Sequence, residues 1–112
     1  MNVNHIVVMT SCPDAPTAER LAETLVAERL VACAQVQPCR SVYRWNGAIQ
    51  RESESLLLLK TAAARWKPLE TRLRALHPYE VPEIIALPIL SGSADYLGFI
   101  ETETGDDDPS HG

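Results

Sequence analysis

The chain has 112 residues, which suffices for one compact domain but not for two independent cores. Its hydrophobic content of 46% and charged content of 22% exclude a disordered, collagenous or membrane-spanning chain. The net charge is −5, but residues 1–100 hold equal numbers of acids and bases, so the body lacks the basic surface that nucleic acid partners require.

The three cysteines and the first residues of the chain indicate in which cellular compartment the protein resides. Cys12, Cys33 and Cys39 cannot all pair within one chain, and no Cys-x-x-Cys spacing indicates a structural zinc site. Cys33 is typical of a small buried residue in a strand. The first five residues lack the basic patch and apolar stretch of a signal peptide, so we expect a cytoplasmic protein.

The first elements are a strand and a helix. Residues 5–10 form a β-branched apolar run that predicts a buried strand, and a turn follows at residues 11–14. Asp14 can cap a helix, and Pro16 suits the first turn of one. Apolar residues then recur at three-and-four spacing, which predicts a helix over about residues 15–29.

A long β-hairpin follows the helix. Asn46-Gly47 separates two runs, at residues 32–45 and 48–61, and both turn residues tolerate the positive φ of a type I′ turn. Pro38 cannot donate a ladder hydrogen bond, so it predicts a bulge or an edge position. The four leucines at residues 56–59 do not alternate with polar residues, which predicts that both faces of that strand are covered.

The second half repeats the helix–strand order. An apolar face predicts a helix from near Trp66 to His77, where Pro78 ends it. Residues 77–83 form a stiff connector with two prolines. Residues 84–90 read as a strand, in which Pro88 predicts an edge position or an early end. After a turn at residues 91–93, a last short helix carries Tyr96, Leu97 and Ile100.

This βαββαβ order with a terminal helix predicts an α+β fold. It is the ferredoxin-like sandwich, in which helices pack on one face of an antiparallel sheet, here with a long β-hairpin and a short C-terminal helix. We expect a single domain over residues 1–103 and a flexible acidic tail over residues 104–112.

The hairpin also predicts assembly. Two strands of about 14 residues would reach roughly 46 Å, whereas a domain of this length is only about 35 Å across. The hairpin must therefore bend or protrude, and it would carry exposed apolar side chains and open strand edges, which natural proteins cover. Our hypothesis is an obligate homo-oligomer whose subunits pair strands.

Several blocks, in the right order over residues 5–102, are similar to the CutA divalent-cation tolerance family. They are Thr10-Ser11-Cys12-Pro13-Asp14, Leu30-Val31-Ala32-Cys33, Ser41-Val42-Tyr43-Arg44-Trp45-Asn46-Gly47, Leu58-Leu59-Lys60-Thr61 and Leu76-His77-Pro78-Tyr79-Glu80-Val81-Pro82-Glu83-Ile84. The resemblance implies a homotrimer of ferredoxin-like subunits, an architecture shared with PII signalling proteins. It also implies a response to metal ions, with binding of copper or another divalent metal.

The family's copper site transfers only in part. His77 matches the histidine of the family's His-Pro-Tyr segment, but the family cysteine falls at Thr10 and its adjacent histidine at Leu76. If the strand continues, Cys12 shares a face with Thr10, which allows a displaced Cys12–His77 pair. Thiolate suits Cu(I) and imidazole suits Cu(II), and Glu80, Glu83 or a neighbouring subunit would complete the ligand shell.

Each ligand also has a structural interpretation. His77 can be a helix C-terminal residue whose charge favours the helix dipole. Cys12 can be a core thiol, although its place before a helix N-terminus would stabilise a thiolate. A second group matches family positions around a cleft between subunits, where a small anionic or metal ligand could bind: Tyr43, Trp45, Lys60, Tyr79 and Glu83. Otherwise these residues are hairpin packing and a surface lysine.

Three functions compete. The first is a non-enzymatic, copper-binding trimer that serves divalent-cation tolerance. The second is a PII-like regulatory trimer that binds a small ligand or partner protein at its clefts. The third is an enzyme with Cys12 as nucleophile and His77 as base, which is the weakest because no phosphate loop, dinucleotide fingerprint or Gly-x-Ser-x-Gly motif is present.

Overall fold

The computed structural model describes residues 3–105 and confirms the ferredoxin-like α+β fold. The elements follow the predicted order with one added 3-10 turn: β1 (His5–Cys12), α1 (Ala15–Ala27), β2 (Cys33–Trp45), β3 (Ala48–Ala62), η1 (Ala63–Arg65), α2 (Trp66–Leu76), β4 (Ile85–Pro88) and α3 (Ala94–Glu103). None of the helices within residues 3–105 has the length and apolar composition needed to span a lipid bilayer.

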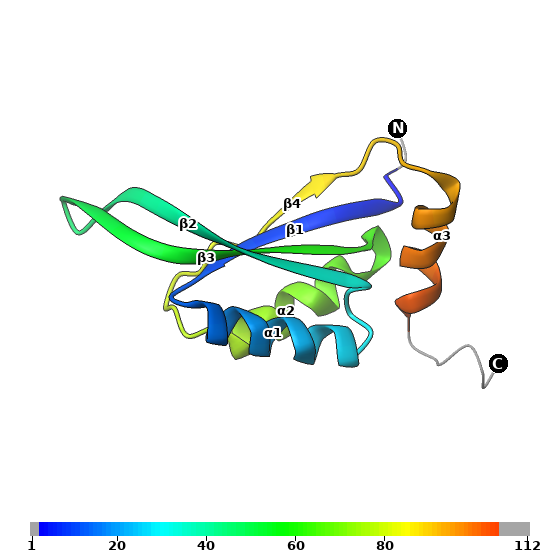
Figure 1. Ribbon diagram of the computed structural model, residues 1–112, viewed down its shortest axis with the longest axis horizontal. Helices are drawn as coiled ribbons and strands as arrows, with labels where there is room; N and C mark the ends of the chain where they lie inside the picture. The colour runs from blue at the N-terminus through cyan, green and yellow to red at the C-terminus, as the bar shows by residue number, and fades with distance from the viewer. Residues whose placement is uncertain (1–2, 106–112) are drawn as a thin grey trace.

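The four strands form one antiparallel sheet in the order β2-β3-β1-β4. Strand β3 therefore lies between β1 and β2, and β1 lies between β3 and β4, which is the split arrangement that the βαββαβ order predicts. Figure 1 shows α1 and α2 side by side on one face of the sheet and α3 at the end opposite the hairpin tip. The other face of the sheet carries no helix layer.

Helix α1 has a predicted start and an unpredicted end. The Asp14 carboxylate accepts a 2.8 Å hydrogen bond from the Thr17 amide, as an N-cap should. The helix ends at Ala27, two residues earlier than predicted, because Arg29 adopts a positive φ of 61°. The amides of Arg29 and Leu30 then donate to the carbonyls of Val26 and Leu25, which is a Schellman motif built without glycine.

The hairpin turn is of the predicted type I′, since Asn46 and Gly47 have φ of 51° and 77°. The register runs without interruption from the Cys33–Lys60 pair to the Trp45–Ala48 pair, so no bulge forms at Pro38. Pro38 is tolerated because β2 is an edge strand. Pro88 likewise ends β4, the other edge strand, two residues earlier than the predicted range.

Burial divides the sheet into a covered face and an open face. On the covered face Val8, Leu57 and Leu59 pack against the leucines of α1 and α2 and are 7% exposed or less. Leu56 and Leu58 point to the other side and are only half-buried, so the prediction that both faces are covered is wrong for one subunit. We call this second side the open face; its apolar residues are Val7, Met9, Leu56, Leu58, Ile85 and Leu87.

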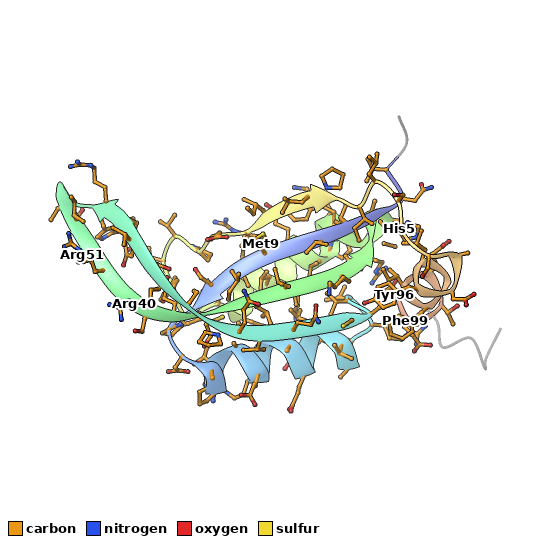
Figure 2. The ribbon with its side chains drawn as sticks, turned by 45° about the horizontal axis from the view of Figure 1, so that its top comes forward. His5, Met9, Arg40, Arg51, Tyr96 and Phe99 are labelled. Atoms are coloured by element: carbon orange, nitrogen blue, oxygen red, sulfur yellow. The ribbon has the colours of Figure 1, made fainter. Side chains whose placement is uncertain are left out.

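The hairpin protrudes from the body, as its length predicts (Figure 1). The described residues span 51 Å along the longest axis but only 29 and 22 Å along the others. Figure 2 shows the open face obliquely, with Met9 between the hairpin and His5. The predicted tail begins at Thr104, which is buried and donates to the Ile100 carbonyl, and residues 106–112 lie outside the described residues.

Candidate functional site

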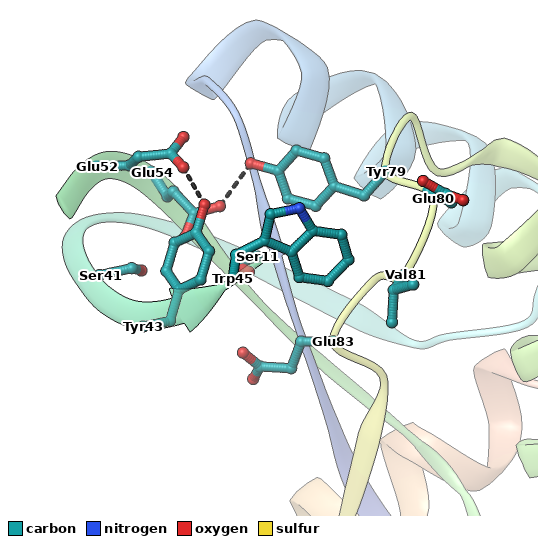
Figure 3. Close-up of a pocket in the computed structure, with 10 residues that line it drawn as sticks. All are labelled: Ser11, Ser41, Tyr43, Trp45, Glu52, Glu54, Tyr79, Glu80, Val81 and Glu83. Carbon is teal, nitrogen blue, oxygen red and sulfur yellow. Dashed lines mark hydrogen bonds between the residues drawn. The ribbon is translucent and has the colours of Figure 1, made fainter. Parts of the chain in front are cut away.

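A pocket of about 340 Å³ lies where the hairpin leaves the body of the domain (Figure 3). The end of β1, the outer halves of β2 and β3, and the connector between α2 and β4 all contribute to its wall. We call it the acidic pocket, because four of its ten lining residues are glutamates: Ser11, Ser41, Tyr43, Trp45, Glu52, Glu54, Tyr79, Glu80, Val81 and Glu83.

Two of the glutamates are held by tyrosine hydroxyls (Figure 3). The Tyr79 hydroxyl donates a 2.5 Å hydrogen bond to Glu54, which is only 9% exposed, and the Tyr43 hydroxyl donates to Glu52. Burial and the bond to Glu54 raise the pKa of Tyr79, while the bond to Glu52 is the main cause of the raised pKa of Tyr43. Both tyrosines are therefore neutral donors.

The acidic pocket brings together most of the predicted cleft residues. Tyr43, Trp45, Tyr79 and Glu83 line it, and so does Glu80, which was considered as one way to complete the ligand shell of the metal. Lys60 does not, since its amino group donates to Gln35 and it lies six residues from Glu54, about 20 Å along the strand. Without that lysine the carboxylates favour a metal or another cationic ligand over an anionic one, which are the two alternatives that the resemblance implied.

Sequence reasoning missed five of the lining residues: Ser11, Ser41, Glu52, Glu54 and Val81. A signal for two of them was present. The Asn46-Gly47 turn fixes the hairpin register, which pairs Ser41 with Glu52 and places Glu52 diagonally from Tyr43 on the same face. The other contacts depend on how the connector folds back, which local sequence does not encode.

His77 lies beside the acidic pocket but does not line it, and both of its ring nitrogens are engaged. The Tyr79 amide donates to Nδ1 at 3.1 Å, so Nε2 carries the proton and donates to the Ser11 carbonyl at 2.9 Å. The side chain is buried, and this burial lowers its pKa. His77 is therefore a neutral imidazole that ties the connector to the end of β1.

Cys12 lies on the covered face, like Thr10, because β1 continues two residues beyond its predicted end. It is fully buried, and burial, with a smaller contribution from the charges of Glu54 and Asp14, raises its pKa to about 11. The thiol stays protonated at neutral pH, so the helix N-terminus after it does not stabilise a thiolate.

These observations test the fit of a copper ion to the predicted ligands. To bind copper, the Cys12 thiol would have to be deprotonated and His77 would need an imidazole nitrogen with a free lone pair. Cys12 offers a buried neutral thiol, and His77 already uses both nitrogens. Within residues 3–105 no three His, Cys, Asp or Glu side chains lie close enough together to hold a metal ion. The Cys12–His77–Glu80 set therefore does not fit copper in this arrangement of one subunit.

Comparison with known proteins gives consistent matches. The sequence matches the family described as CutA1 divalent ion tolerance protein over residues 6–103. A divalent-cation tolerance protein CutA of Thermus thermophilus is 44% identical over 100 residues, which cover 88% of this chain and 97% of the relative. The protein of the same name from Pyrococcus horikoshii is 40% identical over 99 residues with the same coverage. The crystal structure of CutA1 from a psychrotrophic Shewanella species superposes with a TM-score of 0.89 at 35% identity, covering 93% of this chain and 98% of that one.

Proposed function

The chain belongs to the CutA1 family of divalent ion tolerance proteins, and from this we propose that it serves divalent-cation tolerance as a non-enzymatic homotrimer that binds copper or another divalent metal. The observation that supports the assembly is the open face of the sheet. Ile85 and Leu87 there are 48% and 43% exposed, and both edge strands present unpaired backbone groups. Apolar sheet faces and long edges of this kind require a partner.

Metal binding is the part of the proposal that depends on assembly. One subunit does not bring three ligands together within residues 3–105, so the metal is held by the trimer, with donors from more than one chain. Of the three ligands predicted from the sequence, Glu80 lines the acidic pocket. His77 would have to give up a hydrogen bond to bind a metal. Cys12 is not available as a ligand, because its thiol is buried and protonated.

The state of Cys12 also supports a non-enzymatic role. A nucleophilic cysteine needs a thiolate and an accessible sulfur. The Cys12 thiol is fully buried and its pKa is raised, while the predicted base, His77, donates its Nε2 proton to a backbone carbonyl. The predicted cytoplasmic location belongs to the same proposal.

Native mass spectrometry of tag-free protein tests assembly and metal binding together. We expect a trimer that takes up copper when titrated with Cu(II), or with Cu(I) under reducing conditions. Cys12→Ser should retain this uptake, because the buried thiol is not available as a ligand. His77→Ala and Glu80→Gln then test the other two predicted ligands.

A monomeric wild-type protein at micromolar concentration would contradict the proposed assembly. A trimer that takes up neither Cu(I) nor Cu(II) would leave the assembly standing and contradict copper binding. Loss of uptake in Cys12→Ser would contradict the exclusion of Cys12 as a ligand and would require the covered face to open around the metal.

A further inference from the structure

A second, open groove of about 640 Å³ lies in the helix layer, on the side of the sheet away from the open face (Figure 1). We call it the helix groove. The described residues that line it come from the loop after α1 and from α2: Leu30, Lys67, Pro68, Thr71, Arg72 and Ala75. Both charged residues in this set, Lys67 and Arg72, are cations. None of the set lines the acidic pocket, so the helix groove is a separate site.

The start of α2 adds positive potential to the helix groove. The N-cap residue Arg65 makes no side-chain capping bond, and the first turn of the helix contains no acidic residue. The N-terminal end of a helix carries a partial positive charge that favours an anion. Arg65 and Lys67 add full positive charges at the same end, so this part of α2 attracts negative charge.

The two cations of the helix groove can accept further partners. Arg72 donates to the carboxylate of Glu28 at 2.8 and 2.9 Å, and Lys67 donates to Glu70 at 3.1 Å. Exposed ion pairs of this kind contribute little to stability. A guanidinium and an ammonium also carry more N–H donors than these bonds use. A second carboxylate can therefore bind to either side chain.

The end of α3 lies beside the helix groove. The Arg29 guanidinium donates to the Thr102 carbonyl at 2.8 Å, and the Gly105 amide donates to the Arg29 carbonyl at 3.3 Å. Leu30, the next residue along the chain, lines the groove. Arg29 itself is incompletely paired, since Nη1 is 4.0 Å from Glu103 and the buried Nε has no acceptor within residues 3–105. The last described residue is thus held at the edge of a cationic surface.

The sequence continues from Gly105 with three carboxylates, Asp106-Asp107-Asp108. A residue extends a chain by at most about 3.5 Å, so these three reach only about 10 Å beyond Gly105. The described residues span 51 Å, so the aspartates can reach the groove beside them but not the far end of the hairpin. A short tether holds such a segment at an effective concentration on the order of millimolar, at which weak surface ion pairs suffice for binding.

We propose that residues 106–108 dock in the helix groove of their own chain, with their carboxylates bound to Lys67 and Arg72. The segment then neutralises the groove and excludes other acidic ligands from it. For these three residues the proposal replaces the freely flexible tail expected from the sequence. The groove lies away from the open face and the acidic pocket, so this inference is independent of the proposed assembly and metal binding.

Carbodiimide coupling, which joins a carboxylate to an amine with loss of water, tests the proximity directly. The chain has two lysines, Lys60 and Lys67. Peptide mapping of the full-length protein should show Asp106–Asp108 linked to Lys67 and not to Lys60, which donates to Gln35 on the open face. The link between Lys67 and Glu70 shows that the reagent reaches the site.

Isotope mixing identifies which copy supplies the segment. In protein refolded from a mixture of unlabelled and ¹⁵N-labelled chains, both halves of each linked peptide should carry the same label. Mixed labels would assign the segment to a neighbouring copy and overturn the proposal. Coupling of Lys67 to Glu70 alone, or equal coupling of the aspartates to Lys60, would overturn it as well.

Backbone order provides a test without coupling. The amide ¹⁵N order parameters of residues 106–108 should lie above about 0.6 in the wild type and below it in Lys67→Glu. Lys67→Arg keeps the charge and should keep the order. The matched control is Arg20→Glu, because Arg20 is also an exposed helix residue that donates to a side chain three positions away. It should leave the order unchanged, and circular dichroism checks that each variant is folded.

Low order parameters in the wild type, or values that Lys67→Glu does not change, would overturn this inference. An equal loss of order in Arg20→Glu would do so too, because it would show a response to net charge rather than to the helix groove. All of these outcomes leave the trimer and its metal binding to be decided by native mass spectrometry.

Discussion

Thr10 carries a buried hydroxyl that has no hydrogen-bond partner within residues 3–105. Thr61, on the same covered face, is equally buried, but its hydroxyl donates to the Leu30 carbonyl at 2.7 Å. Replacing an unpaired hydroxyl with a methyl group removes a desolvation cost, so Thr10→Val should stabilise the fold by about 1 kcal/mol.

The matched variant is Thr61→Val, which removes the hydrogen bond from the Thr61 hydroxyl to the Leu30 carbonyl. It should destabilise the fold by about 1 kcal/mol or more. Urea denaturation followed by circular dichroism measures both free energies of unfolding. Equal effects of the two substitutions would mean that the Thr10 hydroxyl finds a partner in solution.

His77 makes the stability depend on pH. Burial lowers its pKa below the usual 6.5, although Glu54 and the bond to Ser11 oppose the shift. The unfolded chain therefore binds more protons than the folded one between the lowered pKa and 6.5, and stability rises with pH across that interval. We expect the free energy of unfolding to fall as the pH drops below 6.5, and to fall less in His77→Asn. Urea titrations at pH 7.5 and 5.5 compare the two proteins, and equal losses would contradict this role.

At the scale of the elements, two glycines with open space around them should respond in opposite ways. Gly47 occupies the hairpin turn with φ of +77°, whereas Gly98 lies within α3, and a Cβ would meet nothing within 4 Å at either position. Gly47→Ala should destabilise by about 1 kcal/mol, because an L-residue is strained at this φ. Gly98→Ala should stabilise by roughly 0.5–1 kcal/mol, because alanine is the better helix former. Thermal melts of both variants check the opposite signs.

The sequence predicted those elements whose signal is local. Asn46-Gly47 determined the turn type, and the apolar spacing located α1 and α2 within two residues at each end. The early end of α1 was not predictable, because Arg29 rather than a glycine takes the left-handed position. The role of His77 was not predictable either, since its partner Ser11 lies 66 residues away in the sequence.

At the scale of the whole molecule, the open face should control assembly. Leu87 on this face and Val26 on α1 are 43% and 41% exposed, so a lysine at either position disturbs the isolated subunit about equally. Leu87→Lys should dissociate the proposed trimer, because a charge would be buried against the partner, whereas Val26→Lys should not. Sedimentation velocity distinguishes the two, and an intact trimer in Leu87→Lys would place the interface elsewhere.

The leucines at residues 56–59 show why pattern alone could not separate fold from assembly. Their continuous run predicted a strand covered on both sides, yet α1 and α2 cover only Leu57 and Leu59. Hydrophobicity reports whether a side chain is removed from water but not which chain removes it. The same limit applies to the acidic pocket: the resemblance grouped Tyr43, Trp45, Tyr79 and Glu83, but it did not indicate that Glu52 and Glu54 would add their carboxylates to the same wall.

The order of strands has a consequence for the newly made chain. Strand β1 is synthesised before either of its neighbours, and its residues pair with partners more than forty positions later in β3 and more than seventy later in β4. At 5–20 residues per second a ribosome takes roughly 2–10 s to make the chain between β1 and β3. For that time an apolar strand with two unsatisfied edges is accessible to other nascent chains, so one of the two central strands of the finished sheet carries a risk of aggregation during translation.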